Sequence, residues 1–96
     1  MKPLHFDWDE RKNTINKRKH KGISFEEAQT AFSDPNALVI SDPDHSDVED
    51  RFILLGMSER IRILVICHCY RENDTVIRII SARKATKHEI RTYEGT

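Results

Sequence analysis

The stretch "RIISARKAT", residues 78–86, places positive charges where an apolar segment ends. Arg78 interrupts the apolar run, and Arg83 and Lys84 follow at its end. The planar guanidinium fork of arginine matches the oxygens of a phosphate group, so this cluster has the chemistry of a phosphate-binding site. Each of these residues taken singly is more often a solvated side chain on a half-exposed strand.

Cleavage of RNA without a metal requires a base for the 2′-hydroxyl, an acid for the leaving 5′-oxygen and cations that stabilise the charge on phosphorus. Histidine, lysine and arginine can fill all three roles. In the expected strand 62–70, His68 is a candidate that a neighbouring strand brings towards Arg78, or else a hydrogen-bonded filler. Alternation places Arg78 and Arg83 on opposite faces of a regular strand, and a bulge would let them converge.

Other catalytic and metal-binding patterns are missing from the sequence. It contains no GxGxxG, Walker, HExxH or GxSxG motif. Within the acidic segment 42–50, Asp42, Asp44 and Ser46 have the spacing of calcium ligands, but Ile53 stands where an EF-hand needs a bidentate glutamate. We therefore expect these acids to form turns and caps, and we expect no metal or cofactor.

The chain has 96 residues, which predicts one domain over residues 1–96. It has no run of about 18 apolar residues that could span a membrane, and its first ten residues, "MKPLHFDWDE", lack the apolar core of a signal peptide. Cys67 and Cys69 alternate on a strand and would share one face, which is poor geometry for a disulfide. Free thiols indicate a reducing, cytoplasmic environment.

The net charge of zero conceals a segregated pattern. Residues 1–22 carry seven Lys/Arg and three Asp/Glu, residues 23–50 carry eight Asp/Glu and no Lys/Arg, and residues 51–96 carry nine Lys/Arg and five Asp/Glu. Fields act over a Debye length of about 8–10 Å, so the local pattern matters more than the sum. The pattern predicts a dipolar surface, unless folding interleaves the segments and cancels it.

The predicted elements describe an α+β domain. Their order is β-α-α-β-β-β-β-α, with helices packed on an antiparallel four-stranded meander. Apolar alternation and short turns place the strands at 4–8, 37–40, 51–57, 62–70 and 76–82. The turns 58–60 and 71–75 are short enough for antiparallel hairpins.

The first predicted helix, from Glu10 to about His20, is capped by Asp9 and ends in basic residues. Its only apolar residue is Ile15, so we expect it to bury little and to offer most of its surface to solvent or a partner.

The other two helices have clearer signals. Ser24 with Glu27, and Thr86 with Glu89, have the spacing of capping boxes. An apolar stripe in the second helix consists of Phe25, Ala28 and Phe32, and Asp34-Pro35 follows it.

Several motifs, in this order along nearly the whole chain, resemble the BrnT family of type II toxins. They are "WDE", "SFEEA", "RF…G.S" and "RIISARKAT..E". One departure is Lys21, which separates His20 from Gly22 where family members commonly have His-Gly; one extra residue would turn a helix end by about 100°.

The resemblance implies a RelE-like fold and a ribonuclease that cleaves RNA without a metal and inhibits growth. It also implies a cognate BrnA-type antitoxin, with operator DNA bound only through the antitoxin complex. Combined with the cation pattern, it predicts two sets of site residues. The expected catalytic residues are His20, His68, Arg78 and Arg83, and the expected phosphate ligands are Lys12, Lys19, Arg51 and Lys84.

Some alternatives remain open at this point. Arg51 can instead pair with Asp47 or Glu49. The first helix, through Lys12, Lys17 and Lys19, can bind the antitoxin or serve as a track for RNA. The antitoxin can instead add a strand to an exposed edge of the sheet. The alternative to a toxin is a non-catalytic module that binds nucleic acid or protein, which a net charge of zero favours slightly.

Overall fold

The computed structural model describes residues 5–42 and 50–95 and contains one five-stranded sheet with three helices. The strands are β1 (His5–Asp7), β2 (Leu38–Ser41), β3 (Phe52–Met57), β4 (Ile63–Arg71) and β5 (Val76–Lys84). The helices are α1 (Glu10–Lys19), α2 (Phe25–Ala31) and α3 (Lys87–Glu94). The α+β class and the order of elements agree with the sequence prediction.

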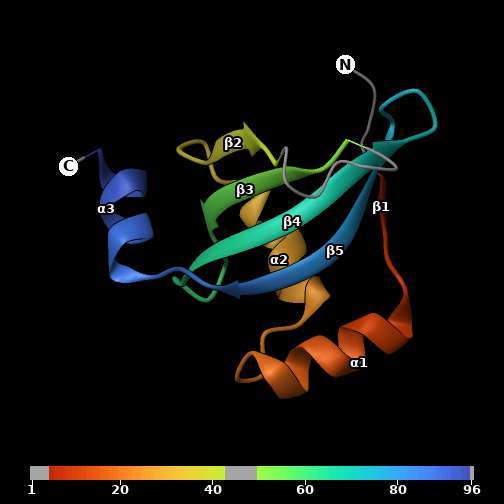
Figure 1. Ribbon diagram of the computed structural model, residues 1–96, viewed down its shortest axis with the longest axis horizontal. Helices are drawn as coiled ribbons and strands as arrows, with labels where there is room; N and C mark the ends of the chain where they lie inside the picture. The colour runs from red at the N-terminus through yellow and green to blue at the C-terminus, as the bar shows by residue number, and fades with distance from the viewer. Residues whose placement is uncertain (1–4, 43–49, 96) are drawn as a thin grey trace.

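The predicted sheet of four antiparallel strands is wrong in one respect, because β1 joins it as a fifth strand. The strand order is β1-β5-β4-β3-β2, and β1 runs parallel to β5 while the other pairs are antiparallel. The sheet is therefore mixed (Figure 1). Short turns in the sequence predict the hairpins between neighbouring strands. The pairing of β1 with β5 joins residues some 70 positions apart, and no local sequence pattern predicts it.

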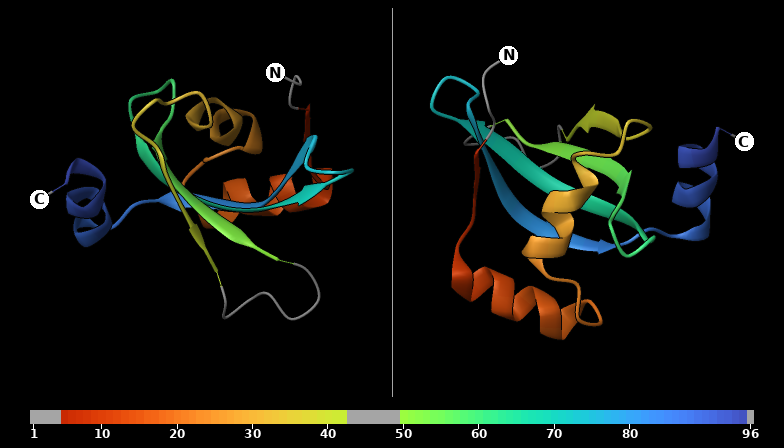
Figure 2. Two further views of the ribbon diagram at one scale, coloured as in Figure 1. Left: turned by 90° about the horizontal axis from the view of Figure 1, so that it is seen from above. Right: turned by 180° about the vertical axis from the view of Figure 1, so that it is seen from behind.

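Helix α2 covers one face of the sheet, as the front and rear views show (Figures 1 and 2). Its apolar stripe packs on the inner side chains of β3, β4 and β5, and this contact forms the core. The fully or almost fully buried members are Ile23, Phe25, Ala28, Ala31, Leu54, Leu64, Ile66, Ile77, Ile79 and Ala82. In Figure 1 the opposite face of the sheet is seen with no helix lying over it.

A β-bulge in β5 decides which side chains reach that opposite face. Cys67 pairs with Ser81, while the next residue, His68, pairs with Ile79, so Ile80 has no partner on β4. Beyond the bulge the alternation of β5 is inverted. Arg78 and Arg83 therefore lie on the same face of the sheet. In a regular strand they would lie on opposite faces.

Helix α1 lies along the free edge of β5 and is held there by polar contacts rather than apolar ones (Figure 1). Ile15 is 50% exposed, whereas Asn13 and Asn16 are buried. The Asn16 side chain accepts a hydrogen bond from the backbone N–H of Ala82 (3.1 Å) and donates to the Ala82 carbonyl (2.8 Å) and to the Ile23 carbonyl (2.9 Å). The expectation that α1 buries little apolar surface is confirmed, but the helix is firmly docked.

Asn16 acts as a substitute for a neighbouring strand. β1 pairs with β5 only between Val76 and Arg78, so the rest of that edge would present unpaired backbone groups. The side-chain amide satisfies both backbone groups of Ala82, as an adjacent strand would. Asn13 plays the matching role towards α2, because its oxygen accepts from the Phe25 N–H (2.9 Å) and its amide donates to Glu26 (2.8 Å).

The capping predictions hold with one difference. Thr86 and Glu89 form a complete capping box at the start of α3. Ser24 caps α2 by accepting from the Glu27 N–H (3.0 Å), but the Glu27 carboxylate instead accepts hydrogen bonds from Ser58 (2.7 Å) and Arg62 (3.0 Å). That nearly buried ion pair joins α2 to the β3–β4 turn.

We predict that Asn16→Ala lowers the free energy of unfolding by about 2–4 kcal/mol, because it leaves buried backbone groups of Ala82 and Ile23 without partners. Chemical denaturation followed by circular dichroism measures this loss. Ile15→Ala, on the exposed side of the same helix, serves as the control and should change stability by no more than about 0.5 kcal/mol. Equal losses in the two variants would show that α1 is not held by Asn16.

Candidate functional site

A basic pocket lies where the C-terminal end of α1 meets the end of β5. It has a volume of about 280 Å³ and is lined by Lys19, His20, Lys21, Arg83, Lys84 and Thr86. Four of these were predicted from the sequence as site residues, although Lys19 and His20 lie more than 60 positions from Arg83 and Lys84. Helix α1 brings them together because Asn16, one turn before His20, is bonded to Ala82, the residue before Arg83.

The chain turns sharply after α1 and thereby presents its basic end to the pocket. Lys21 and Gly22 both have positive φ angles, +54° and +83°, and the Gly22 N–H donates to the Lys17 carbonyl (2.8 Å). Glycine suits this conformation, whereas a lysine there is strained. Lys21, which interrupts the His-Gly pattern of the sequence, is itself a member of the basic pocket. The signal for it was the glycine that follows a basic helix end.

A second pocket, the sheet-face pocket, opens on the side of the sheet that α2 does not cover. It has a volume of about 340 Å³ and is lined by Asp42, Arg51, Ile53, Val65, Cys67, Ile80, Ser81 and Arg83. Arg83 lines both pockets, so its side chain is shared by the two. Arg51 and Arg83, both predicted as site residues, line this pocket together, and their roles in a site stay a prediction. The alternative partners of Arg51, Asp47 and Glu49, lie outside the described residues.

Arg83 is held by Glu89 of α3 in a two-pronged ion pair. Its Nη1 and Nη2 atoms lie 2.8 and 2.9 Å from the two carboxylate oxygens, and Nη1 also donates to the Lys84 carbonyl (3.2 Å). These contacts use three of the five N–H donors of the guanidinium. The Nε–H and one Nη2–H form the other edge of the planar group, which can bind two oxygens of a phosphate while Glu89 stays in place.

Lys84 and Thr86 contribute further groups to the basic pocket. Lys84 is exposed and supplies a flexible ammonium group, and Thr86 caps α3 at its N-terminus. A helix N-terminus favours nearby anions, so the start of α3 adds to the positive potential of the basic pocket.

Three predicted site residues lie apart from the pockets. Lys12 is exposed on α1 and, among the described residues, lines neither pocket. Arg78 shares the face of Arg83 but forms an ion pair with Asp7 of β1.

His68 is fully buried on the other face of the sheet. Its ring packs edge-on against Phe32 with centroids 4.9 Å apart, and Nδ1 contacts the Ile66 carbonyl (3.2 Å). Burial lowers the pKa of His68, which keeps the ring neutral. The expectation that it approaches Arg78 is wrong, because His68 pairs with Ile79 and points away from Arg78. The geometry therefore favours the alternative in which His68 is a hydrogen-bonded packing residue of the core.

Among residues 5–42 and 50–95 there is no cluster of three or more His, Cys, Asp or Glu side chains placed to hold a metal ion. Cys67 and Cys69 are free thiols on one face of β4, as predicted. No helix in the described part of the chain has the length and apolar character needed to cross a membrane.

The ion pair between Arg83 and Glu89 predicts a pH dependence of stability. Hydrogen bonds from Arg83, and then from Thr86, lower the pKa of Glu89 to about 2. A lowered pKa means that the carboxylate stabilises the fold fully above its unfolded value near 4.5 and that this contribution disappears as the pH falls towards 2. The stability difference between the wild type and Glu89→Gln should therefore be constant above about pH 5 and shrink steadily below it.

Denaturant titrations between pH 2 and pH 7 check this prediction. Glu94→Gln, at an exposed position of the same helix, should show no such change across the series. A difference for Glu89→Gln that stays the same down to pH 2 would contradict the ion pair.

Comparisons with known proteins identify the family and the fold. The family model described as the ribonuclease toxin BrnT of a type II toxin–antitoxin system matches residues 8–89. The 1.1 Å crystal structure of the Brucella abortus ribonuclease toxin BrnT superposes with a TM-score of 0.66, covering 88% of this chain and 99% of that one, at 21% sequence identity. None of the curated proteins matches the chain.

The structural likeness concerns the fold, and the relation to RelE-type toxins stays a prediction. The family match extends from Trp8 to Glu89 and thus includes every residue of both pockets. On that match, the chain belongs to the BrnT family of ribonuclease toxins of type II toxin–antitoxin systems.

Proposed function

We propose that this chain is a metal-independent endoribonuclease whose substrate phosphate binds between the basic pocket and the sheet-face pocket, at Arg83. Family membership supports the ribonuclease activity, and the position of Arg83 in both pockets carries the assignment of the site. A phosphodiester there meets cations from α1, from β3 and from the end of β5. Growth inhibition follows from the loss of cellular RNA, and a BrnA-type antitoxin that binds operator DNA as part of the complex would relieve it.

The proposed roles follow from chemistry and position. Arg83 binds the non-bridging oxygens through its open guanidinium edge and stabilises the extra negative charge of the pentacoordinate phosphorus. His20 is half-buried in the basic pocket and is the described histidine best placed to exchange a proton with the 2′-hydroxyl or the leaving 5′-oxygen. Lys19, Lys21 and Lys84 attract the RNA backbone, and Arg51 extends this track across the sheet.

Glu89 then acts as a positioning residue. By holding Nη1 and Nη2 of Arg83, it fixes the direction in which the other edge of the guanidinium faces. Preorganised donors lose less freedom when charge develops in the transition state, which is the main source of electrostatic catalysis.

We expect Arg83→Ala to lower the rate of RNA cleavage by 100-fold or more, on the order of 2.7 kcal/mol of transition-state stabilisation. Arg83→Lys keeps the charge but removes the planar fork, and it should restore only a small part of the activity. Cleavage of a fluorogenic oligoribonucleotide under single-turnover conditions measures both effects. Arg60→Ala, an exposed arginine in the β3–β4 turn, is the control; if Arg83→Ala cleaves as fast as this control, the site lies elsewhere.

We also expect cleavage to continue undiminished in excess EDTA, because the described protein side chains can supply the acid, the base and the cations of the reaction. The same assay with purified, antitoxin-free protein measures it. The products should end in a 2′,3′-cyclic phosphate, which mass spectrometry identifies. Loss of activity in EDTA with recovery in Mg²⁺ would refute metal independence, and RNA binding without any cleavage would favour a non-catalytic module.

A further inference from the structure

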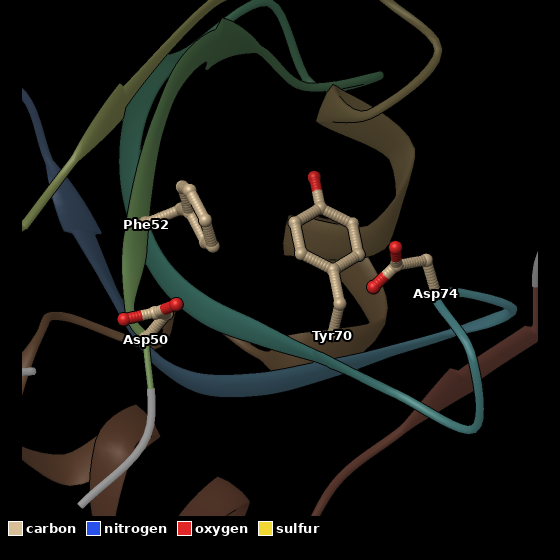
Figure 3. A pocket seen from close by; sticks show the side chains of 4 residues that line it. All are labelled: Asp50, Phe52, Tyr70 and Asp74. Carbon is tan, nitrogen blue, oxygen red and sulfur yellow. The ribbon is translucent and has the colours of Figure 1, made fainter.

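A further pocket lies on the face of the sheet that α2 covers, away from the two pockets above, and belongs to none of the chemistry described there. It has a volume of about 560 Å³ and is lined by Asp50, Phe52, Tyr70 and Asp74. Figure 3 shows the two aromatic rings side by side on β3 and β4, with Asp50 below Phe52 and the carboxylate of Asp74 directed towards Tyr70. We name it the acidic–aromatic pocket.

Its aromatic wall is a fixed feature of the sheet. The rings of Phe52 and Tyr70 pack edge to face with centroids 5.3 Å apart. Behind them lies His68, whose Nε2 contacts the Tyr70 hydroxyl at 3.4 Å and whose ring stays neutral because burial lowers its pKa. No positive charge from His68 therefore opposes a cation in the pocket.

The β4–β5 turn carries one of the two carboxylates. Glu72, Asn73 and Asp74 all have positive φ angles, +52°, +57° and +65°. Asparagine and aspartate tolerate this left-handed conformation better than other non-glycine residues, although it remains less favourable than ordinary backbone. The turn places Asp74 next to Tyr70, and burial, followed by the charge of Asp74, raises the pKa of the phenol.

This combination of groups selects an organic cation. Aromatic faces carry negative potential and bind ammonium or guanidinium groups, and two carboxylates reinforce that preference. The same carboxylates repel the phosphates of RNA. A divalent metal needs more oxygen ligands than two carboxylates supply, whereas a planar guanidinium can stack on a ring and pair with a carboxylate at once.

The surroundings of the pocket indicate that the cation belongs to a protein. The edge strand β2 has three consecutive exposed apolar residues, Leu38, Val39 and Ile40, which are 41%, 50% and 61% exposed. Ser41 pairs with Phe52 and Val39 with Leu54, so the Val39 side chain lies on the same face as the pocket. Leu38 and Ile40, which pair with Leu55 and Ile53, lie on the other face, so a segment covering β2 has to follow its edge. A free small cation would leave this apolar strand uncovered, whereas a polypeptide can cover it and insert one basic side chain.

We propose that the acidic–aromatic pocket receives an arginine side chain of the antitoxin, and that apolar residues beside this arginine cover β2. The identification of the partner rests on the toxin function proposed above, and the choice of arginine rests on the pocket itself. The pocket faces away from Arg83, so this contact anchors the antitoxin without occupying the substrate phosphate site.

The first experiment tests the pocket on the isolated chain, independently of any ribonuclease activity. N-acetyl-arginine methylamide is titrated into labelled protein, and the ring signals of Phe52 and Tyr70 are followed by NMR. We expect saturable shifts with a dissociation constant of roughly 1 mM or somewhat above, equivalent to about 4 kcal/mol. The matching citrulline compound has the same shape without charge and should cause at least tenfold weaker shifts; equal binding of the two would overturn the cation site.

The second experiment tests the occupant. The double substitution Asp50→Asn and Asp74→Asn removes both charges, and asparagine preserves the left-handed backbone at residue 74. This variant should bind the purified cognate antitoxin at least tenfold more weakly, about 1.4 kcal/mol, mainly through faster dissociation. Its cleavage of RNA in the absence of antitoxin should stay within twofold of wild type. The control pair Glu59→Gln and Glu94→Gln should alter neither property.

A double-mutant cycle then identifies the inserted residue. One arginine of the antitoxin, when changed to alanine, should weaken binding to wild-type toxin but have little further effect on the Asp50→Asn, Asp74→Asn variant. If wild-type and variant toxin bind the antitoxin equally, the pocket is not its anchor. If the variant instead gains affinity for RNA while antitoxin binding is unchanged, the carboxylates repel RNA from this face and the proposal is wrong.

Discussion

The side-chain amide of Asn16, bonded to both backbone groups of Ala82, is the contact on which the site depends. A sheet edge requires a partner for its backbone, and β1 is too short to supply one along the whole of β5. Asn16 completes that edge with its side chain. Its two hydrogen bonds to Ala82 also fix the position of α1 along the length of β5. His20 lies one helical turn beyond Asn16, and Arg83 directly follows Ala82. A purely apolar interface would not define this register as tightly, because apolar packing has no direction.

The bulge at Ile80 and the ion pair between Arg83 and Glu89 complete the site from the other side. Without the bulge, Arg83 would point into the α2 face, where Ala82 now packs in the core. With it, the guanidinium reaches the open face and meets the first turn of α3. Glu89 also belongs to the capping box of α3. Its carboxylate therefore orients Arg83 and stabilises the N-terminus of α3 at the same time. The bulge at Ile80 and the capping residue Glu89 thus together determine where the Arg83 side chain lies.

The sequence allowed the elements and four of the six residues that line the basic pocket to be predicted, for reasons that are visible residue by residue. Alternation, turn residues and the Thr86–Glu89 box define β3, β4, β5 and α3, and the same cation cluster indicated Arg83 and Lys84. The parallel pairing of β1 was not predictable, because nothing local encodes a contact between residues 7 and 78. The docking of α1 was missed because apolar periodicity is the usual sign of a buried helix face, whereas here the buried face consists of Asn13 and Asn16. Their i, i+3 spacing was the available signal. The approach of His68 to Arg78 was expected wrongly because the bulge at Ile80 places Arg78 on the opposite face of the sheet from His68.

The fold brings residues from the two basic segments of the chain to one pocket and an acidic residue from the middle segment to another. The basic N-terminal segment ends at His20 and Lys21, and the basic C-terminal segment contributes Arg83 and Lys84 to the same pocket. The acidic middle segment ends at Asp50, which lies in the acidic–aromatic pocket on the other face, where Asp74 joins it. A molecule with no net charge can therefore attract a polyanion at one site and a cationic protein segment at another. The two pockets differ in the sign of the charges that line them, so a partner bound at the acidic–aromatic pocket need not share the chemistry of the substrate.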